Sequence, residues 1–263
     1  MAIYGVLGDI HGNREALVAV LDALEARGVT KLLCVGDIVG YNADPDECVA
    51  LLRERNTVCI SGNHDLIGTR RLGFERCSNK AMHSLQRTRR TLHPDTWRYL
   101  ESLPARLPIE DRIVLVHGGV RDVEQYMTRP KHIVENVEFL RKDFPGRNVC
   151  FYGHTHEQKV YEVDGADVRE LQASGTVILR EDREYFLNAG SVDASRKHAH
   201  KLAEFAVFDS ARLVVDFFQV SYNDVLTESK ASVGGYRLPR WADRLYEVKR
   251  RFVGPRQRDS EIA

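Results

Sequence analysis

The sequence predicts an α/β fold, and three observations lead to that class. Up to about residue 157, short apolar runs alternate with amphipathic stretches of helical period. This alternation is typical of βαβ units and of a largely parallel sheet. Beyond that point the segments are short and alternate apolar with polar residues, as antiparallel strands do. Most of the predicted strands in the first part run into a glycine motif that contains Asp, Asn or His.

The expected elements follow from apolar spacing and from the residues that interrupt it. The helix after the first strand has Leu17 and Leu24 on one apolar face and ends at a glycine, a typical C-terminal stop. A second helix is predicted to begin at Asp44-Pro45, with Asp44 as its N-cap. We expect strands over 3–7, 31–35, 57–60, 113–116 and 149–152, and helices over 13–27, from 44 onwards and over 130–142.

Residues 66–107 break this alternation and are predicted to form a helical, cap-like insertion. The stretch is polar, rich in arginine and punctuated by proline. Arg87, Arg89 and Arg90 have two interpretations: they line a cap that meets an anionic substrate, or they form a solvated helix face. The second is the commoner outcome for a run of charges, and we favour it.

The rest of the chain is predicted to add antiparallel strands of a second sheet and a tail. Residues 1–222 are taken as one domain and 223–263 as a helical tail. An apolar stripe in this tail is expected to pack on the chain's own surface rather than on a partner or a membrane. The stripe is Trp241, Leu245, Val248 and Phe252. The expected strands are 159–163, 168–171, 177–179 and 185–187, followed by a closing hairpin of 204–208 and 213–220.

Composition and charge narrow the expected partners and location. Lys+Arg and Asp+Glu both number 38, so no global field attracts nucleic acid or an anionic membrane. No apolar run approaches the ~20 residues that cross a bilayer, and we expect no signal peptide. The five cysteines include no C-x-x-C pair, which favours reduced core thiols and a cytoplasmic location. Assembly into a homo-oligomer is left open.

Eight polar side chains that follow predicted strands form the candidate site. The carboxyl ends of parallel strands meet at one edge of an open α/β sheet, so motifs far apart in sequence converge there. Imidazoles, carboxylates and an amide oxygen suit borderline divalent cations. These donors are too many for a single ion, and a carboxylate can bridge two ions. The set therefore fits a pair of metal ions. The candidate residues are Asp9, His11, Asp37, Asn63, His64, His117, His154 and His156.

A pair of divalent ions at this edge indicates displacement at phosphorus. Two ions ~3.5–4 Å apart form a recurring clamp for in-line attack, in which they lower the pKa of a shared water and neutralise phosphate oxygens. A hydroxide that bridges the ions would attack the phosphorus atom, and a further imidazole can protonate the leaving oxygen. The expected partner is therefore a small phosphate-ester substrate.

The order and approximate spacing of these motifs resemble those of the calcineurin-like metallophosphoesterases. The match extends from residue 1 to about residue 195. The resemblance implies a four-layer sandwich in which two mixed β-sheets are flanked by helices. The five matching motifs are Asp9-x-His11, Gly36-Asp37, Gly62-Asn63-His64-Asp65, His117-Gly118 and Gly153-His154-x-His156.

The resemblance also implies two sets of metal ligands. Asp37 would be the carboxylate that bridges the two ions. The first set would be Asp9, His11 and His156, and the second would be Asn63, His117 and His154.

The resemblance further implies the residues that meet the substrate. His64 would be catalytic, either as the acid that faces the leaving group or as a stabiliser of the transition state. Asn63 and His64 would contact the substrate. Tyr41, which departs from the family pattern, is expected to line the pocket and contact the substrate, and a packing role fits it equally well. Asn188 resembles a polar residue near the site in the small bacterial branch of the superfamily.

Two departures from the family pattern narrow the expected activity. Protein Ser/Thr phosphatases of this superfamily carry Gly-Asp-x-x-Asp-Arg-Gly, in which the arginine clamps phosphate and the second aspartate orients the catalytic histidine. Gly40 and Tyr41 occupy those two positions here. Without that cation, a monoanionic diester is better served than a dianionic monoester. This favours the small bacterial (YfcE-like) phosphodiesterase branch and leaves the partner that orients His64 unidentified.

Several alternatives stay open at this stage. A phosphomonoesterase or a dinucleoside polyphosphate hydrolase would use the same ligands. A non-catalytic scaffold is less favoured, because the retromer subunit of this fold lacks the histidine of the Gly-Asn-His motif and His64 is present here. A nuclease is disfavoured because no extensive basic surface is evident. Manganese is our default metal, while iron, zinc, cobalt and nickel fit the same donors.

Overall fold

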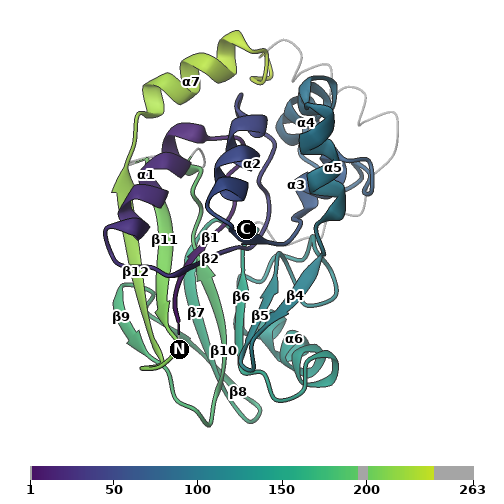
Figure 1. The fold of residues 1–263 in the computed structure, drawn as a ribbon. Helices are drawn as coiled ribbons and strands as arrows, with labels where there is room; N and C mark the ends of the chain where they lie inside the picture. The colour runs from purple at the N-terminus through teal and green to yellow at the C-terminus, as the bar shows by residue number, and fades with distance from the viewer. Residues whose placement is uncertain (1, 195–200, 240–263) are drawn as a thin grey trace.

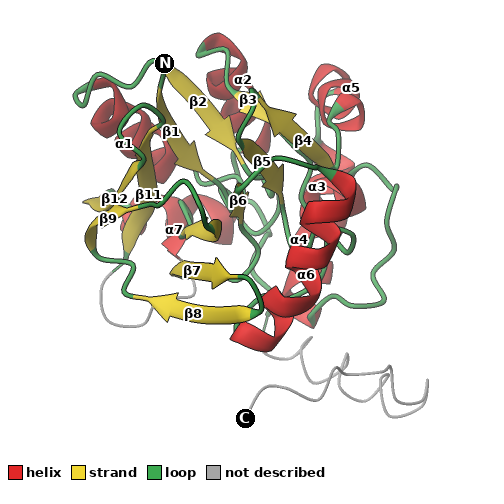
Figure 2. Ribbon diagram, turned by 90° about the horizontal axis from the view of Figure 1, so that it is seen from below, coloured by secondary structure: helices red, strands yellow, loops and turns green. Residues whose placement is uncertain are grey.

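Two six-stranded mixed sheets lie face to face in the computed structural model, and helices cover their outer faces (Figure 1). The structure describes residues 2–194 and 201–239. Figure 2 shows the view along the sandwich, with α1 and α2 outside one sheet and α6 outside the other. The four-layer arrangement implied by the family resemblance is therefore confirmed.

The elements agree closely with the expected ranges, apart from the exceptions given below. The helices are α1 (Arg14–Glu25), α2 (Pro45–Glu54), α3 (Asn63–Gly68), α4 (Asn79–Thr91), α5 (Pro94–Ser102), α6 (Pro130–Asp143) and α7 (Asp224–Val233). The strands are β1 (Ile3–Leu7), β2 (Lys31–Cys34), β3 (Val58–Cys59), β4 (Arg106–Ile109), β5 (Ile113–Val116), β6 (Val149–Tyr152), β7 (Gln158–Asp164), β8 (Asp167–Leu171), β9 (Gly175–Ile178), β10 (Glu184–Ala189), β11 (Leu202–Asp209) and β12 (Val214–Ser221).

Each sheet combines parallel and antiparallel pairs. The first has the order β3-β2-β1-β11-β12-β9, and its parallel strands are β1, β2 and β3. The second has the order β4-β5-β6-β10-β7-β8, and its parallel strands are β5, β6 and β10. The glycine motifs follow the parallel strands of both sheets, so the candidate site draws on both layers.

The apolar runs are continuous because most of these strands are buried on both faces. In β1, Tyr4 points into the core between the sheets, whereas Leu7 packs beneath α1 and α2. In β5, Leu115 joins the same central core, whereas Val116 packs against α6. Successive side chains point to opposite faces of a strand, which places one residue in each layer.

Two strand predictions were wrong. The segment that forms β9 was expected in the second sheet, yet it pairs with β12 in the first sheet. Alternation shows which face of a strand is buried but does not identify its partner. The other was a strand that was not expected: the helical insertion was predicted to end at about Leu107, yet β4 begins at Arg106 and contains Pro108. A proline is tolerated there because β4 is an edge strand.

The described part of the tail packs against the first helices. α7 lies across α1 (Figure 1), and Lys230 pairs with Glu15 at 2.7 Å and with Asp44. Asp44 stands at the N-cap position of α2 but makes no capping hydrogen bond with its side chain, so the expected cap is replaced by this ion pair. The apolar stripe 241–252 lies outside the described residues, and the domain boundaries stay a prediction.

Candidate metal centre

All eight candidate residues meet at the ends of the parallel strands. They come from five separate turns, and each is at most 6% exposed. Burial of so many polar side chains is costly unless each is paired or binds an ion. Five free cysteines are buried elsewhere in the described chain and contribute no ligand to this cluster.

Three sets of donors are close enough together to hold an ion. Within each set the ligand atoms lie within 4.8 Å of one another. The sets are Asp9–His11–His156, His11–Asp37–His64 and Asp37–His117–His154. The first and third correspond to the two ligand sets that the resemblance implied. Asn63 adds its Oδ1 atom to the third, at 3.1 Å from Nε2 of His117.

The imidazoles are oriented as metal ligands are. The Nδ1 atom of His117 lies 2.7 Å from the carbonyl oxygen of Val35, and its Nε2 atom lies 3.3 Å from Asp37. The Nδ1 atom of His11 lies 3.3 Å from the carbonyl oxygen of Val39, and its Nε2 atom lies 3.7 Å from Asp37. A carbonyl that accepts the Nδ1 proton leaves the Nε2 lone pair directed at the site.

Donor chemistry at one end of the cluster fits a cation. The Nε2 atoms of His11 and His156 are 3.1 Å apart, and Asp9 lies 3.3 Å from the second of them. An imidazole nitrogen that carries no proton has a lone pair and can only accept. Two such nitrogens at this separation therefore need a proton or a cation between them. The residues present therefore fit a divalent ion held by Asp9, His11 and His156.

The electrostatics of the site indicate that it favours positive charge. Burial raises the pKa of Asp37, but the charges of His117, His64 and His11 outweigh burial and hold that pKa well below its ordinary range. Burial lowers the pKa of His117, but Asp37 outweighs it and raises the pKa to about 9. Protons and metal ions therefore compete for the same donors.

Six residues of the site have left-handed backbone conformations that non-glycine residues seldom adopt. They account for six of the ten such residues in the described chain. Conformations of this kind cost of order 1–3 kcal/mol each and persist only where the surroundings enforce them. The six residues are Asp9, His11, Asp37, Tyr41, His154 and His156, with φ between 50° and 68°.

The turns hold one another in place. The backbone N–H groups of Ile10 and His11 donate to the carbonyl oxygen of Asp37 at 2.8 and 2.9 Å. Gly62 lies so close that a Cβ atom there would stand 2.1 Å from Oδ1 of Asp37, the same oxygen that accepts from the backbone N–H of His64. Only glycine fits at this approach.

Asp65 is a structural residue that sequence reasoning assigned no role. Its buried carboxylate accepts hydrogen bonds from the backbone N–H groups of Ile38, Val39 and Gly62 at 2.9 to 3.1 Å. It therefore ties the turn after β2 to the turn after β3. Burial and the charge of Asp37 raise the pKa of Asp65 to about 7. The only sequence feature that pointed to a role for Asp65 was its position directly after the candidate residues Asn63 and His64.

His64 is positioned by packing. Its ring lies edge-on to His11, with centroids 4.6 Å apart, and tilted against Tyr41 at 4.8 Å. A Cβ atom on Gly40, which has φ +101°, would come within 2.4 Å of Nδ1 of His64. Arg237 donates to the carbonyl oxygen of Tyr41 at 2.7 Å, so the tail helps to fix this pair of rings. A side chain at position 40, such as an orienting aspartate, would therefore collide with His64 as it is placed here.

Asn188 supports a ligand turn. Its Nδ2 group donates to the carbonyl oxygen of Gly153 and to Oγ1 of Thr155, both at 2.9 Å. These residues flank His154, so Asn188 fixes the turn that carries His154 and His156. Tyr126 was missed altogether: its ring packs on His154 with centroids 4.0 Å apart, and no sequence motif marks it.

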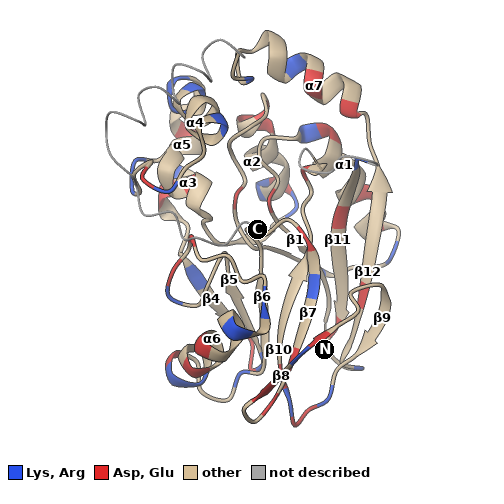
Figure 3. Ribbon diagram, turned by 180° about the vertical axis from the view of Figure 1, so that it is seen from behind, with Lys and Arg blue, Asp and Glu red and all other residues tan. Residues whose placement is uncertain are grey.

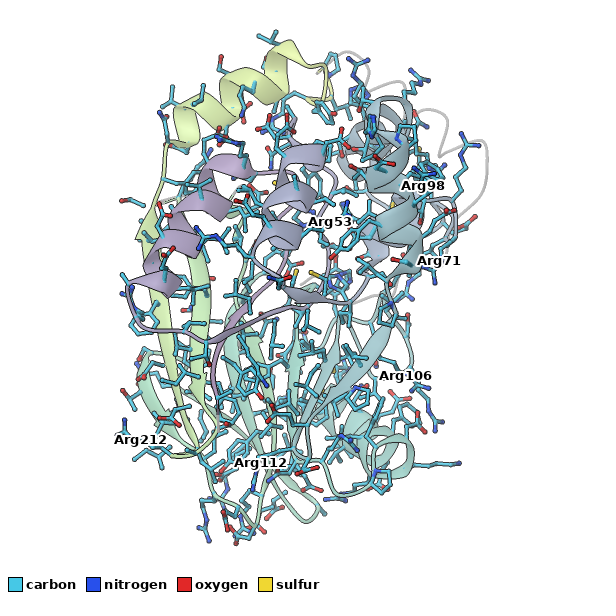
Figure 4. All side chains as sticks on the ribbon, viewed as in Figure 1. Arg53, Arg71, Arg98, Arg106, Arg112 and Arg212 are labelled. Carbon is cyan, nitrogen blue, oxygen red and sulfur yellow. The ribbon has the colours of Figure 1, made fainter. Side chains whose placement is uncertain are left out.

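Arginines of the helical insertion serve the fold. Arg71, labelled beside α5 in Figure 4, donates to the carbonyl oxygens at the end of that helix at 3.1 and 3.3 Å. Arg89 donates to the carbonyl oxygen of Ile67 at 2.8 Å, and Arg87 donates to a carbonyl beyond α7 at 2.9 Å. Arg90 is exposed. Figure 3 shows acidic and basic residues interspersed along the ribbon.

Fold and site together define a class of protein: two mixed sheets with a buried cluster of metal-ligand side chains at their shared edge. The family model of the calcineurin-like phosphoesterases matches residues 4–158. The chain therefore belongs to this family of phosphoesterases, as its motifs predicted. Among the described residues, no helix has the length and apolar character needed to span a membrane.

Individual relatives match over nearly the whole chain. An uncharacterized protein of Methanocaldococcus jannaschii is 32% identical over 253 residues, which are 93% of this chain and 98% of that protein. The crystal structure of a metallophosphoesterase from Sphaerobacter thermophilus is 28% identical, with a TM-score of 0.75 over 92% of this chain and 97% of that one. A hypothetical protein of Pyrococcus horikoshii shares the fold at 19% identity, with a TM-score of 0.69 over 93% of this chain and 97% of that one.

Proposed function

We propose that the protein hydrolyses phosphodiester bonds of small substrates with two divalent metal ions, manganese by default. The observation that carries the proposal is a pair of buried donor sets, Asp9–His11–His156 and Asp37–His117–His154, with Asp37 also within reach of His11. Two ions held there would activate a water and neutralise phosphate oxygens. The five buried free thiols support a reducing location such as the cytoplasm.

The chain's own residues account for the rest of the reaction. Asp37 lies between the two donor sets and would be shared by both ions. Asn63 would hold the second ion and face the substrate. As the bond from phosphorus to the leaving oxygen breaks, His64 would give its proton to that oxygen. Its packing against Tyr41 and His11 fixes the direction of that transfer.

A diester is favoured over a monoester by the charges around the site. A dianionic monoester is best bound by a guanidinium that offers two parallel hydrogen bonds. Tyr41 stands where such a clamp is found in the protein phosphatases. The nearby guanidinium of Arg237 donates instead to the Tyr41 carbonyl oxygen and to Asn42, and it pairs with Glu228 at 2.7 Å. A monoanionic diester carries less negative charge and therefore needs fewer cationic groups for binding.

The test compares bis(4-nitrophenyl) phosphate with 4-nitrophenyl phosphate on protein loaded with Mn²⁺. We expect a higher kcat/KM for the diester. His64→Ala should lower kcat by about 100-fold or more, within the range of a general acid, with Mn²⁺ stoichiometry unchanged. His93→Ala is the matched control, because His93 is an exposed histidine at the start of α5.

Three outcomes would contradict the proposal. Faster monoester turnover would favour a phosphomonoesterase. Hydrolysis of a dinucleoside polyphosphate but not of the diester would favour that class. Full activity in both His64→Ala and Asn63→Ala would show that this site does not carry the hydrolysis, and would favour a binding role for it.

A further inference from the structure

We infer that Tyr126 is a stacking surface for a flat ring, an aryl group or a nucleobase, on the substituent that the ester retains after hydrolysis. The inference rests on the proposed function and extends it to the class of substrate. The ring of Tyr126 packs on the imidazole of His154 with centroids 4.0 Å apart and an angle of 42° between the planes. Tyr126 is nevertheless 48% exposed, so the residue that packs on this metal-ligand histidine also faces solvent.

Tyr126 is held in place by its neighbours rather than by its own ring. The side chain of Gln125 accepts from Asn136 at 2.9 Å, and the carbonyl oxygen of Met127 accepts from the hydroxyl of Tyr152 at 3.2 Å. Met127 itself is fully buried. The loop therefore keeps its shape without an exposed aromatic at 126. A rigid ring on a fixed loop binds a partner with little loss of conformational entropy.

A second anchor ties this loop to the helical insertion. Arg76 pairs with Asp122 at 2.8 Å and donates to the carbonyl oxygen of Glu124 at 3.0 Å. The loop is therefore fixed from both sides, by α6 and β6 on one and by the segment before α4 on the other. These contacts hold Tyr126 beside His154 without help from a substrate.

The arrangement of the site assigns Tyr126 to the retained substituent. His64, the proposed acid for the leaving group, lies with His11 and Tyr41 at one end of the cluster. Tyr126 lies with His154 in the other donor set, and Asp37 belongs to sets at both ends. Attack at phosphorus is in line with the leaving oxygen. The attacking and leaving oxygens are then the two apical groups on phosphorus, and the retained group is equatorial. Because Tyr126 packs on His154 and not at the end where His64 would meet the leaving oxygen, we assign its ring to the retained group.

Stacking favours any flat ring and does not distinguish one ring from another. Every base and every aryl group has a π-face, so a tyrosine platform accepts both and rejects a small alkyl group by default. One stacked base on an aromatic side chain changes affinity by roughly tenfold or somewhat more. The expected substrates are diesters in which phosphorus retains a nucleoside or an aryl group.

The experiment uses three diesters with the same 4-nitrophenolate leaving group and a different retained group: methyl, 4-nitrophenyl, and thymidine joined through its 5′-oxygen. The kcat/KM of each variant is divided by that of wild type for the same ester, which cancels intrinsic reactivity. We expect Tyr126→Ala to lose about tenfold on both ring-bearing esters and less than about twofold on the methyl ester. Tyr126→Phe should retain activity on all three.

Val134→Ala is the matched control, because Val134 is also 48% exposed and lies on the neighbouring α6. Binding of thymidine 5′-monophosphate and of inorganic phosphate by calorimetry gives a readout that does not depend on turnover. Tyr126→Ala should weaken only the nucleotide, and its Mn²⁺ stoichiometry should match wild type.

The outcomes separate this inference from the proposed function. No hydrolysis of any of the three diesters by wild type would overturn the proposed function, and nucleotide binding would then decide the inference. Equal losses on all three esters would place the ring under the leaving group and overturn the inference. An unchanged ratio on the ring-bearing esters would overturn it too, while leaving the diesterase activity intact.

Discussion

The turns at the strand ends and the helical insertion beside them both hold side chains in place, but by different means. In the turns the backbone is constrained: Asp37 has φ 53°, and its carbonyl oxygen accepts two backbone N–H groups from the turn after β1. In the insertion the long side chains of Arg71 and Arg89 reach across to backbone carbonyls. A strained backbone has few alternatives, whereas a guanidinium on a flexible stem has many. We therefore expect the turns to tolerate little change and the insertion to tolerate more.

The largest expected effect is the pH dependence of Mn²⁺ affinity, which tests whether His117 in the turn after β5 carries a proton in the metal-free protein. The pKa of His117 is raised to about 9, so below that pH the metal-free site keeps a proton that a metal ligand must lose. Binding of Mn²⁺ should therefore release about one proton at pH 7, and affinity should rise up to about tenfold per pH unit until pH 9. Calorimetry in two buffers with different ionisation heats measures the released proton. Affinity that is constant between pH 7 and 9 would show that His117 is neutral in the free protein.

An intermediate effect separates backbone strain from crowding in the turns. Gly40→Ala and Gly28→Ala both place a side chain at positive φ, but only the Cβ at 40 meets His64, and the Cβ at 28 meets nothing within 4 Å. We expect each to lose about 1 kcal/mol or more of stability in thermal or urea unfolding. Gly40→Ala should also lower kcat at least about tenfold because His64 is displaced. Equal activity in both variants would show that the position of His64 is not limiting.

The smallest expected effect is in the insertion. Arg71→Ala removes two hydrogen bonds to carbonyl oxygens at the end of α5. Because the side chain is exposed, we expect a loss of about 1 kcal/mol of stability and no change in kcat/KM. Denaturant unfolding and the diester assay measure the two quantities. A fall in kcat/KM with stability preserved would show that the insertion positions the substrate and tolerates as little change as the turns do.

The sequence allowed prediction of the site residues whose side chains are common metal ligands. His117 and His154 follow buried apolar strands, and parallel strands of one fold bring such ends together, so their meeting was predictable. Asp65 was overlooked because its role depends on the path of the turn after β2. Tyr126 was overlooked because a loop tyrosine looks the same in sequence whether it packs on a ligand or faces solvent.

The fold was also predictable where it depends on local residue patterns, and not where it depends on contacts between distant segments. Apolar runs such as 113–116 show that a strand is buried on both faces, and the alternation with helices shows the class. The partner of β9 was not encoded in its own short segment, since a four-residue strand fits the edge of either sheet. The replacement of the Asp44 cap by an ion pair with Lys230 depended on a contact almost two hundred residues away in the chain.

The left-handed backbone at the site residues has a consequence for protein engineering. A centre of this type cannot be grafted onto another scaffold by copying its histidines and aspartates onto regular strands or helices, because those elements do not offer the required φ values. The loops would have to be transplanted whole, together with Gly62, which leaves room for Asp37, and Asp65, which ties two of the loops together. The smallest portable unit is a set of interlocked loops.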